Sequence, residues 1–367
     1  MMPDVEEAIP KITPPVLSFR DIVGHDGALR LLGSLLRRDA FPQALRFVGE
    51  AGTGKSTVAR ILATTLFCPN ARRSDPIQPC NQCPACVKMA HGTHPDFLHL
   101  VPETVSKPDG REVEGPIKID AIRDMQARLV FRPIEAERRI VLIDPADAMN
   151  EAAANGLLKT LEEPPAYVLL ILIVSCPDVL PDTLHSRCQK VAFHAPAFSQ
   201  VEALVRQRRG YDVADARLVT AMAGGRIGEA LSLSVEAART QETALHALVS
   251  DDTLTHNDAL LALAKHQTES EARMRQGLYY LSAWFRDVLV FQSVVGGVDP
   301  SWLVYTWRHD EIQQWAERAD AHAAARFLAR VQEIQRGEAR NLNRQLAMET
   351  LLLTLQALRE TACPAQG

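Results

Sequence analysis

The chain has 367 residues, a length that predicts two or three domains with ample room for a buried core. Aromatic residues make up only 5% of it, so the core must consist mainly of Leu, Ala, Val and Ile, which favours helices packed around a sheet. The net charge of −5 and the pI near 6.1 argue against a tight nucleic-acid binder driven by phosphate contacts.

The first 17 residues are acidic and proline-rich, and we expect them to form a flexible tail. They lack the basic and then apolar pattern of a signal peptide, and no run approaches the roughly 18 apolar residues of a membrane helix. We therefore expect a cytoplasmic protein without a membrane partner, where disulfides are rare. Folding should begin near Phe19, followed by a helix whose apolar residues recur at helical spacing: Ala28, Leu31, Leu32, Leu35 and Leu36.

The stretch from Ala44 to Leu62 carries a phosphate-binding motif. An apolar strand-like run ends near Val48, residues 49–56 read G-E-A-G-T-G-K-S, and an apolar helical pattern follows. In this motif the backbone N–H groups bind phosphate oxygens, Lys55 reaches the β and γ phosphates, and the Ser56 hydroxyl binds Mg²⁺. The alternative is a glycine-rich turn that binds nothing, which the strand, loop and helix context disfavours. The predicted nucleotide-binding residues of this segment are Gly49, Gly52, Gly54, Lys55, Ser56 and Thr57.

Four of the seven cysteines lie within residues 68–86 with the spacing C-x₁₁-C-x₂-C-x₂-C. Four thiolates at such intervals predict a tetrahedral Zn²⁺ site, which is closed and structural because no position is left for a catalytic water. The alternative is a set of unlinked thiols, and the nearby His91 and His94 are interpreted as loop residues. The other three thiols suggest no shared site. The predicted zinc ligands are Cys68, Cys80, Cys83 and Cys86, and the remaining cysteines are Cys176, Cys188 and Cys363.

A polar loop from Pro102 to Gly115 and an amphipathic helix are expected before a strand that ends in Asp144. In P-loop ATPases an acid at this place holds Mg²⁺, and a following Glu often activates the attacking water. Here the following residue is Pro145, so the expected general base is absent, and Asp147 is a poor substitute. We interpret Glu162 as the solvated end of the next helix.

Residues 167–174 form a continuous apolar run, which is typical of a parallel strand buried on both faces. Ser175 follows it, either as a group that senses the γ phosphate or as a simple polar residue at a strand end. Strands that alternate with helices predict an α/β parallel sheet whose ligand lies at the carboxyl ends of the strands.

The order of these motifs resembles that of the bacterial DNA polymerase III clamp-loader ATPases. The resemblance rests on the phosphate loop, the four-cysteine insert, the Asp-ended strand, the run LLKTLEEPP at 157–165 and the triplet SRC at 186–188. It implies an AAA+ module whose nucleotide sites lie between adjacent subunits. By this resemblance Arg187 is an arginine finger that reaches the site of a neighbour. The segment from Ile22 to His25 borders the adenine, with Val23 and Gly24 as nucleotide-binding residues.

The resemblance also implies the domain organisation. Residues 18–195 would be the AAA+ module, with the zinc insert at 68–86, residues 196–240 a small helical lid, and residues 241–367 an all-α collar. Apolar stripes at helical spacing support the helical remainder, and periodicity alone says only that their faces are buried. These stripes contain Leu260, Leu261 and Leu263; Leu278, Leu281, Trp284 and Phe285; Phe327, Leu328, Val331 and Ile334; and Leu346, Met348, Leu351 and Leu352.

Two departures separate the chain from the ATP-hydrolysing gamma and tau members. One is Pro145, and the other is Gly228, which occupies the position of a second sensing arginine, with Arg226 two residues away. We therefore expect ATP or ADP to bind with Mg²⁺ and with little hydrolysis, in a stator that works with gamma/tau and delta subunits, primer-template DNA and, indirectly, the sliding clamp (beta). The alternatives are a gamma-type motor subunit and a zinc-dependent nucleic-acid-binding module, which the acidic charge disfavours.

Overall fold

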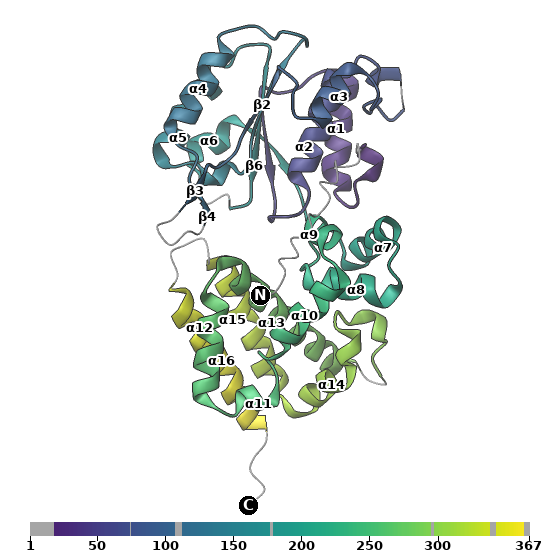
Figure 1. Cartoon of the computed structure of the whole chain (residues 1–367), viewed down its shortest axis with the longest axis vertical. Coiled ribbons are helices and arrows are strands. Elements are labelled where there is room, and N and C mark those ends of the chain that lie inside the picture. Colours follow the sequence, from purple (N-terminus) through teal and green to yellow (C-terminus); the bar gives the residue numbers. More distant parts are fainter. Residues whose placement is uncertain are drawn as a thin grey trace, which may run out of the picture. The chain divides into compact units, whose positions relative to one another are not determined.

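The computed structural model describes residues 18–73, 75–106, 112–176, 179–294, 297–337 and 343–362. The chain divides into two compact units, Met1–Pro196 and Ala197–Gly367 (Figure 1). The expected tail of residues 1–17 and the thiol of Cys363 lie outside the described residues. Within the described ranges, no helix is both long and apolar enough to cross a membrane.

A five-stranded parallel sheet forms the centre of the first unit, in the order β2-β5-β6-β1-β7. Strands β5 and β6 each have a neighbour on both sides and are buried along their whole length. The continuous apolar run at 167–174 predicts this burial for β6. The parallel sheet confirms the predicted α/β class. The strands are β1 (Ala44–Val48), β2 (Phe97–Leu100), β5 (Arg139–Ile143), β6 (Val168–Val174) and β7 (Gln189–Ala192).

Helices cover both faces of this sheet (Figure 1). Alternate residues of β5 and β6 face opposite sides, because side chains alternate along a strand. Leu142 and Ile171 pack with α1 and α2, whereas Val141 and Leu170 pack with α4, α5 and α6. The helices are α1 (Asp26–Arg38), α2 (Lys55–Phe67), α3 (Pro84–Ala90), α4 (Ile119–Leu129), α5 (Glu151–Glu162) and α6 (Asp182–Arg187), with 3-10 turns at Phe19–Asp21, Ala71–Arg73 and Ala146–Ala148.

The stretch expected to be a polar loop, 102–115, contains an antiparallel pair instead, β3 (Thr104–Ser106) with β4 (Glu112–Glu114). Each strand has three residues and lacks a long apolar alternation, so the pairing leaves no clear periodic signal in the sequence. The predicted amphipathic helix before β5 is present as α4. Its apolar face, which contains Ile122, Met125 and Leu129, is buried, and the apolar pattern of the sequence extends one residue further to Val130, which is the C-cap and is 75% exposed.

The second unit is helical, as predicted, and one apolar core runs from Val201 to Leu358. Leu261 and Leu346, expected in buried stripes, are exposed, whereas their neighbours Leu260 and Met348 are buried. The division into lid and collar stays a prediction. The helices are α7 (Phe198–Arg209), α8 (Val213–Met222), α9 (Ile227–Ser232), α10 (Val235–His246), α11 (Asp251–Leu254), α12 (Asn257–Thr268), α13 (Glu271–Ser293), α14 (His309–Arg318), α15 (Ala321–Gly337) and α16 (Arg344–Ala362), with 3-10 turns at Pro300–Trp302 and Thr306–Arg308.

Candidate functional site

The phosphate loop, residues 49–56, joins the end of β1 to the start of α2. Gly52 has a φ of 77° and Gly54 a φ of 91°, angles that a residue with a Cβ rarely adopts. Gly54 is the N-cap of α2, so Ser56 and Thr57 lie in the first helical turn, whose N–H groups have no partner within the helix. The loop therefore presents the backbone donors that a phosphate requires.

Gly49, the first residue of the phosphate loop, packs against the backbone of Phe193, which follows β7. A Cβ placed on Gly49 would lie 2.3 Å from the carbonyl oxygen of Phe193, closer than any real contact. Backbone bonds fix both segments, because Gly49 N–H donates to Val174 O at 3.2 Å and Phe193 N–H donates to Val48 O at 2.7 Å. The start of the phosphate loop is thus held tightly against the sheet.

Lys55 lies inside the loop with its side chain buried, and its residue is 3% exposed. Its Nζ donates to the carbonyl oxygens of Gly49 and Glu50, both at 2.6 Å, and to Ser175 Oγ at 3.2 Å. Burial lowers the pKa of Lys55, while the nearby carboxylates of Asp147 and Asp144 oppose that shift. The structure therefore brings together the predicted phosphate-binding lysine and the predicted sensor serine.

Asp144 follows β5 directly, at the same carboxyl edge of the sheet. Its Oδ2 lies 4.0 Å from His99 Nε2, and its charge acts on Lys55. Asp147 has a different place, because its two carboxylate oxygens accept the N–H groups of Ser175 and Cys176, each at 3.1 Å. A carboxylate that holds the turn after β6 is poorly suited to activate a water, so these contacts favour a structural role for Asp147.

His25, the last residue of the segment that the resemblance places beside the adenine, lies beside the phosphate loop. It follows Val23 and Gly24, the predicted adenine-facing residues, and its Nε2 lies 2.7 Å from Thr53 O. Gly24 has a φ of 74°, and a Cβ there would lie 3.3 Å from Pro196 Cβ. The expected adenine segment and the phosphate loop are therefore in direct contact. No sequence pattern indicates this bond, because a lone His after a Val-Gly pair has no spacing signal.

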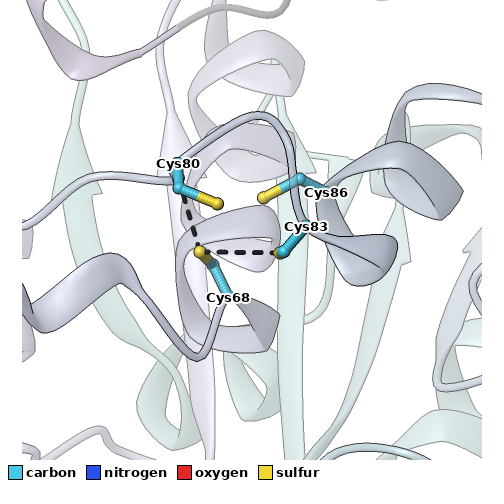
Figure 2. Close-up of side chains that lie close together, drawn as sticks. All are labelled: Cys68, Cys80, Cys83 and Cys86. Carbon is cyan, nitrogen blue, oxygen red and sulfur yellow. Dashed lines mark hydrogen bonds between the residues drawn. The ribbon is translucent and has the colours of Figure 1, made fainter.

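The four predicted zinc ligands meet at the far end of α2 (Figure 2). Cys68 is the C-cap of α2, Cys83 is the N-cap of α3, and Cys86 lies within α3. All four sulfurs lie within 4.8 Å of one another. In a tetrahedral zinc site with bonds of about 2.3 Å the sulfurs are roughly 3.8 Å apart, so the cluster fits a zinc ion.

The electrostatics of the cluster favour metal binding further. Backbone N–H groups, chiefly that of Gln82, lower the pKa of Cys80 to about 6, so this thiol ionises readily. Burial raises the pKa of Cys68 and of Cys86, and a cation is the natural means of keeping buried thiolates. The two histidines differ: His91 is exposed, whereas His94 stacks on Phe67 with ring centroids 4.0 Å apart, and neither belongs to the cluster.

Arg187 ends α6, and its side chain is 34% exposed. Its Nη2 donates to Glu162 Oε1 at 2.6 Å and its Nη1 to Thr183 O at 2.9 Å. Glu162, interpreted as a solvated helix end, is half exposed and is paired with Arg187. The Arg187 contacts among the described residues include none to the phosphate loop.

Gly228 lies in the first turn of α9, and a Cβ on it would meet no atom within 4 Å. Arg226 is the N-cap of that helix and forms an ion pair with Glu229. The guanidinium of Arg226 is thus already bound within its own helix.

Two family models match this chain: one described as DNA polymerase III, delta subunit, at residues 24–197, and one described as DNA polymerase III, delta subunit, C terminal, at residues 238–357. DNA polymerase III subunit delta' of Bacillus subtilis is 31% identical over 339 residues, 89% of this chain and 95% of that protein. The delta' subunit of Pseudomonas aeruginosa is 40% identical over 159 residues, 43% of this chain and 45% of that protein.

Similarity extends to other subunits of DNA polymerase III. DNA polymerase III subunit tau of Bacillus subtilis is 34% identical over 176 residues, 48% of this chain and 29% of that protein. Among solved structures, a DNA polymerase III gamma subunit-related protein from Thermotoga maritima aligns over 89% of this chain and 99% of that chain, with 18% identity and a TM-score of 0.38.

Proposed function

The chain belongs to the delta-prime family of DNA polymerase III subunits, and we propose that it is the stator of a clamp loader in DNA replication. In this role it assembles with gamma/tau and delta subunits around primer-template DNA and helps to place delta on the sliding clamp. Its own phosphate loop binds ATP or ADP with Mg²⁺, and its main chemical contribution is Arg187, donated to the ATP site of a neighbouring subunit.

The observation that carries this proposal is the position of Arg187. Arg187 is the middle residue of the SRC triplet, which comes after the LLKTLEEPP run, and its side chain is partly exposed to solvent. Within the described chain it contacts Glu162, Thr183 and Ser186 rather than the phosphate loop. To reach the site of another subunit, Arg187 would exchange its partly exposed ion pair with Glu162 for the phosphate of the neighbour. A guanidinium at the γ phosphate stabilises the charge that develops in the transition state and raises the rate by about 10³–10⁵.

Weak hydrolysis in cis is part of the same proposal. A clamp-loader site needs a group that activates water, and Pro145 offers none beside Asp144. Asp147 has its carboxylate bound to two backbone N–H groups, and Gly228 supplies no cation. Lys55, Ser56 and Asp144 suffice to hold a nucleotide and its Mg²⁺, so binding without turnover fits these residues.

The zinc ion proposed at the four cysteines has a structural role. All four positions are sulfur, so no position is open for water or substrate. When bound, zinc would fix Cys68 at the end of α2 to the loop and helix that carry the other three ligands.

A gamma-type motor subunit is the second candidate, favoured by one observation. Lys55, Ser175 and Asp144 are assembled around an intact phosphate loop, which a pure stator does not need. A motor would show turnover by the isolated chain that Lys55→Ala abolishes.

The deciding experiment measures ATP hydrolysis, stimulated by clamp and primer-template DNA, in a loader reconstituted with gamma and delta. We expect Arg187→Ala to reduce turnover at the adjacent site by about 10³, and Lys55→Ala in this chain to have little effect. Arg123→Ala is the matched control, because Arg123 is also an exposed arginine paired with an acid of its own chain. Severe loss from Lys55→Ala with no effect of Arg187→Ala would identify a motor instead.

A further inference from the structure

His25 is a buried histidine that the proposed chemistry does not use. Its residue is 9% exposed, its ring packs against Phe193 with centroids 5.0 Å apart, and its Nε2 lies 2.7 Å from the carbonyl oxygen of Thr53. The backbone around it is unusual, because His25 has a φ of 62° at the N-cap of α1 and follows Gly24 with a φ of 74°. Such a conformation persists only where surrounding contacts hold it.

The partner fixes the tautomer of the ring. A carbonyl oxygen can only accept, so Nε2 must carry the proton and donate to Thr53 O. Nδ1 is buried and has no hydrogen-bond partner among the described residues. A neutral ring protonated at Nε2 satisfies both facts. Burial, the largest cause, lowers the pKa of His25 and favours this neutral form, while the bond to Thr53 opposes the shift. The charges of His194 and Lys55 lower the pKa further, and the charge of Asp26 raises it.

Thr53 lies between the two positive-φ glycines of the phosphate loop, Gly52 and Gly54. Its carbonyl and the N–H of Gly54 belong to one planar trans peptide and point in opposite directions. A bond that holds the carbonyl of Thr53 toward His25 therefore turns the N–H of Gly54 away from His25. In a phosphate-binding loop the backbone N–H groups point to the inside of the loop, where the phosphate binds. With the Thr53 carbonyl turned toward His25, the N–H of Gly54 is oriented in that direction.

We propose that His25 is a positioning residue for nucleotide binding, whose Nε2–H bond to Thr53 O sets the Thr53–Gly54 peptide so that Gly54 N–H faces the phosphates. The proposal rests on the proposed nucleotide binding. Because His25 directly follows the adenine-facing pair Val23 and Gly24, the same bond joins the base side of the site to its phosphate side. The preferred ligand is a nucleotide with at least two phosphates.

The test measures ADP affinity by calorimetry on the full, zinc-loaded chain. His25→Leu removes the donor and leaves Thr53 O unpaired, and we expect affinity to fall about tenfold. His25→Gln keeps an N–H donor of similar reach, and we expect its ADP affinity to stay within about threefold of that of the original chain. A purely space-filling role for the ring would not give this rescue. His194→Leu is the control, because His194 is a neighbouring but exposed histidine.

Unfolding curves and zinc content of each variant show whether the first unit is intact, and the Gln variant keeps the test valid if His25→Leu does not fold. If the original chain binds ADP and His25→Leu binds it equally well, the inference fails and the proposed nucleotide binding stands. Equal loss in the Leu and Gln variants also overturns it. No binding by the original chain overturns both.

Discussion

The two ends of helix α2 differ in how their polar groups find partners. At the first end, Lys55 donates to two carbonyl oxygens and a hydroxyl, Thr53 Oγ1 donates to Glu50 O, and His25 binds Thr53 O. At the last end, the thiol of Cys68 meets the thiol of Cys83 at 3.9 Å, a weak contact. The side chains of Lys55, Thr53 and His25 therefore have partners within the chain, although the first backbone N–H groups of α2 remain for a phosphate. The thiol of Cys68 has only weak partners, the thiol of Cys83 and the N–H of Cys80 at 3.4 Å, so we expect a metal to supply strong bonds there.

From this difference we expect the metal, rather than the nucleotide, to be the structural ligand. A ligand that replaces existing hydrogen bonds changes function more than stability, whereas a ligand that supplies the only strong bonds of a segment contributes to its folding. We expect nucleotide to act in the first way and zinc in the second.

The largest effect should come from Cys86→Ser, which removes a ligand that is 1% exposed. The protein should lose its zinc, and unfolding of the first unit should become easier by about 3 kcal/mol or more, since structural zinc binding is worth roughly 10 kcal/mol. Metal analysis and calorimetry measure the two effects. Cys188→Ser is the control, a buried thiol outside the cluster. A Cys86→Ser chain with one zinc and unchanged stability would contradict a structural role for the metal.

The next effect should come from Lys55→Met at the other end of α2. We expect nucleotide affinity to fall about a hundredfold, which is about 2.7 kcal/mol, with stability changed by less than about 1 kcal/mol. The stability change is small because burial, which lowers the pKa of Lys55, offsets the loss of its hydrogen bonds. Titration calorimetry and urea unfolding measure both quantities, with the exposed Lys118→Met as control. Marked destabilisation without loss of binding would reverse the assignment of the two ends.

The smallest effect should be a pH dependence of the free energy of unfolding, which arises from one histidine near each end of α2. Burial lowers the pKa of His25, near Lys55, and of His94, which stacks on Phe67, below the ordinary value of 6.5. The unfolded chain therefore binds protons more readily, so stability is complete above about pH 6.5 and falls as the pH drops toward the lowered values.

His25→Gln and His94→Gln should each reduce this loss by up to about 1 kcal/mol between pH 7.5 and pH 6.0, measured by urea unfolding. An unaltered pH profile in both variants would show that neither ring is held neutral. His91→Gln, which replaces an exposed histidine outside both ends of α2, is the control.

Local pattern predicted the parts of the first unit that depend on nearest neighbours in sequence. The apolar run of β6, the glycines of the phosphate loop and the cysteine spacing each carry their signal within about twenty residues. The four sulfurs were expected together and lie together. The sheet order and the short strands β2 and β7 carry no such signal, because pairing with distant strands decides them.

The contacts between segments could not be predicted either. The bond of His25 to Thr53, the ion pair of Arg187 with Glu162, and the hold of Asp147 on Ser175 join residues 25 or more positions apart. Each involves a common polar residue with no diagnostic spacing. Only the folded chain shows that Glu162 is engaged and that Asp147 is occupied.

The fit of Gly49 against Phe193 has an evolutionary consequence. Any side chain at position 49 would place its Cβ 2.3 Å from the carbonyl oxygen of Phe193 and push apart the segments that follow β1 and β7. A lineage that no longer needs nucleotide can lose the amine of Lys55 and keep its fold, but it cannot easily replace this glycine. In descendants that no longer bind nucleotide, we expect Lys55 to be substituted before Gly49. The glycine would then be retained after binding is lost, because the packing of the chain still requires it.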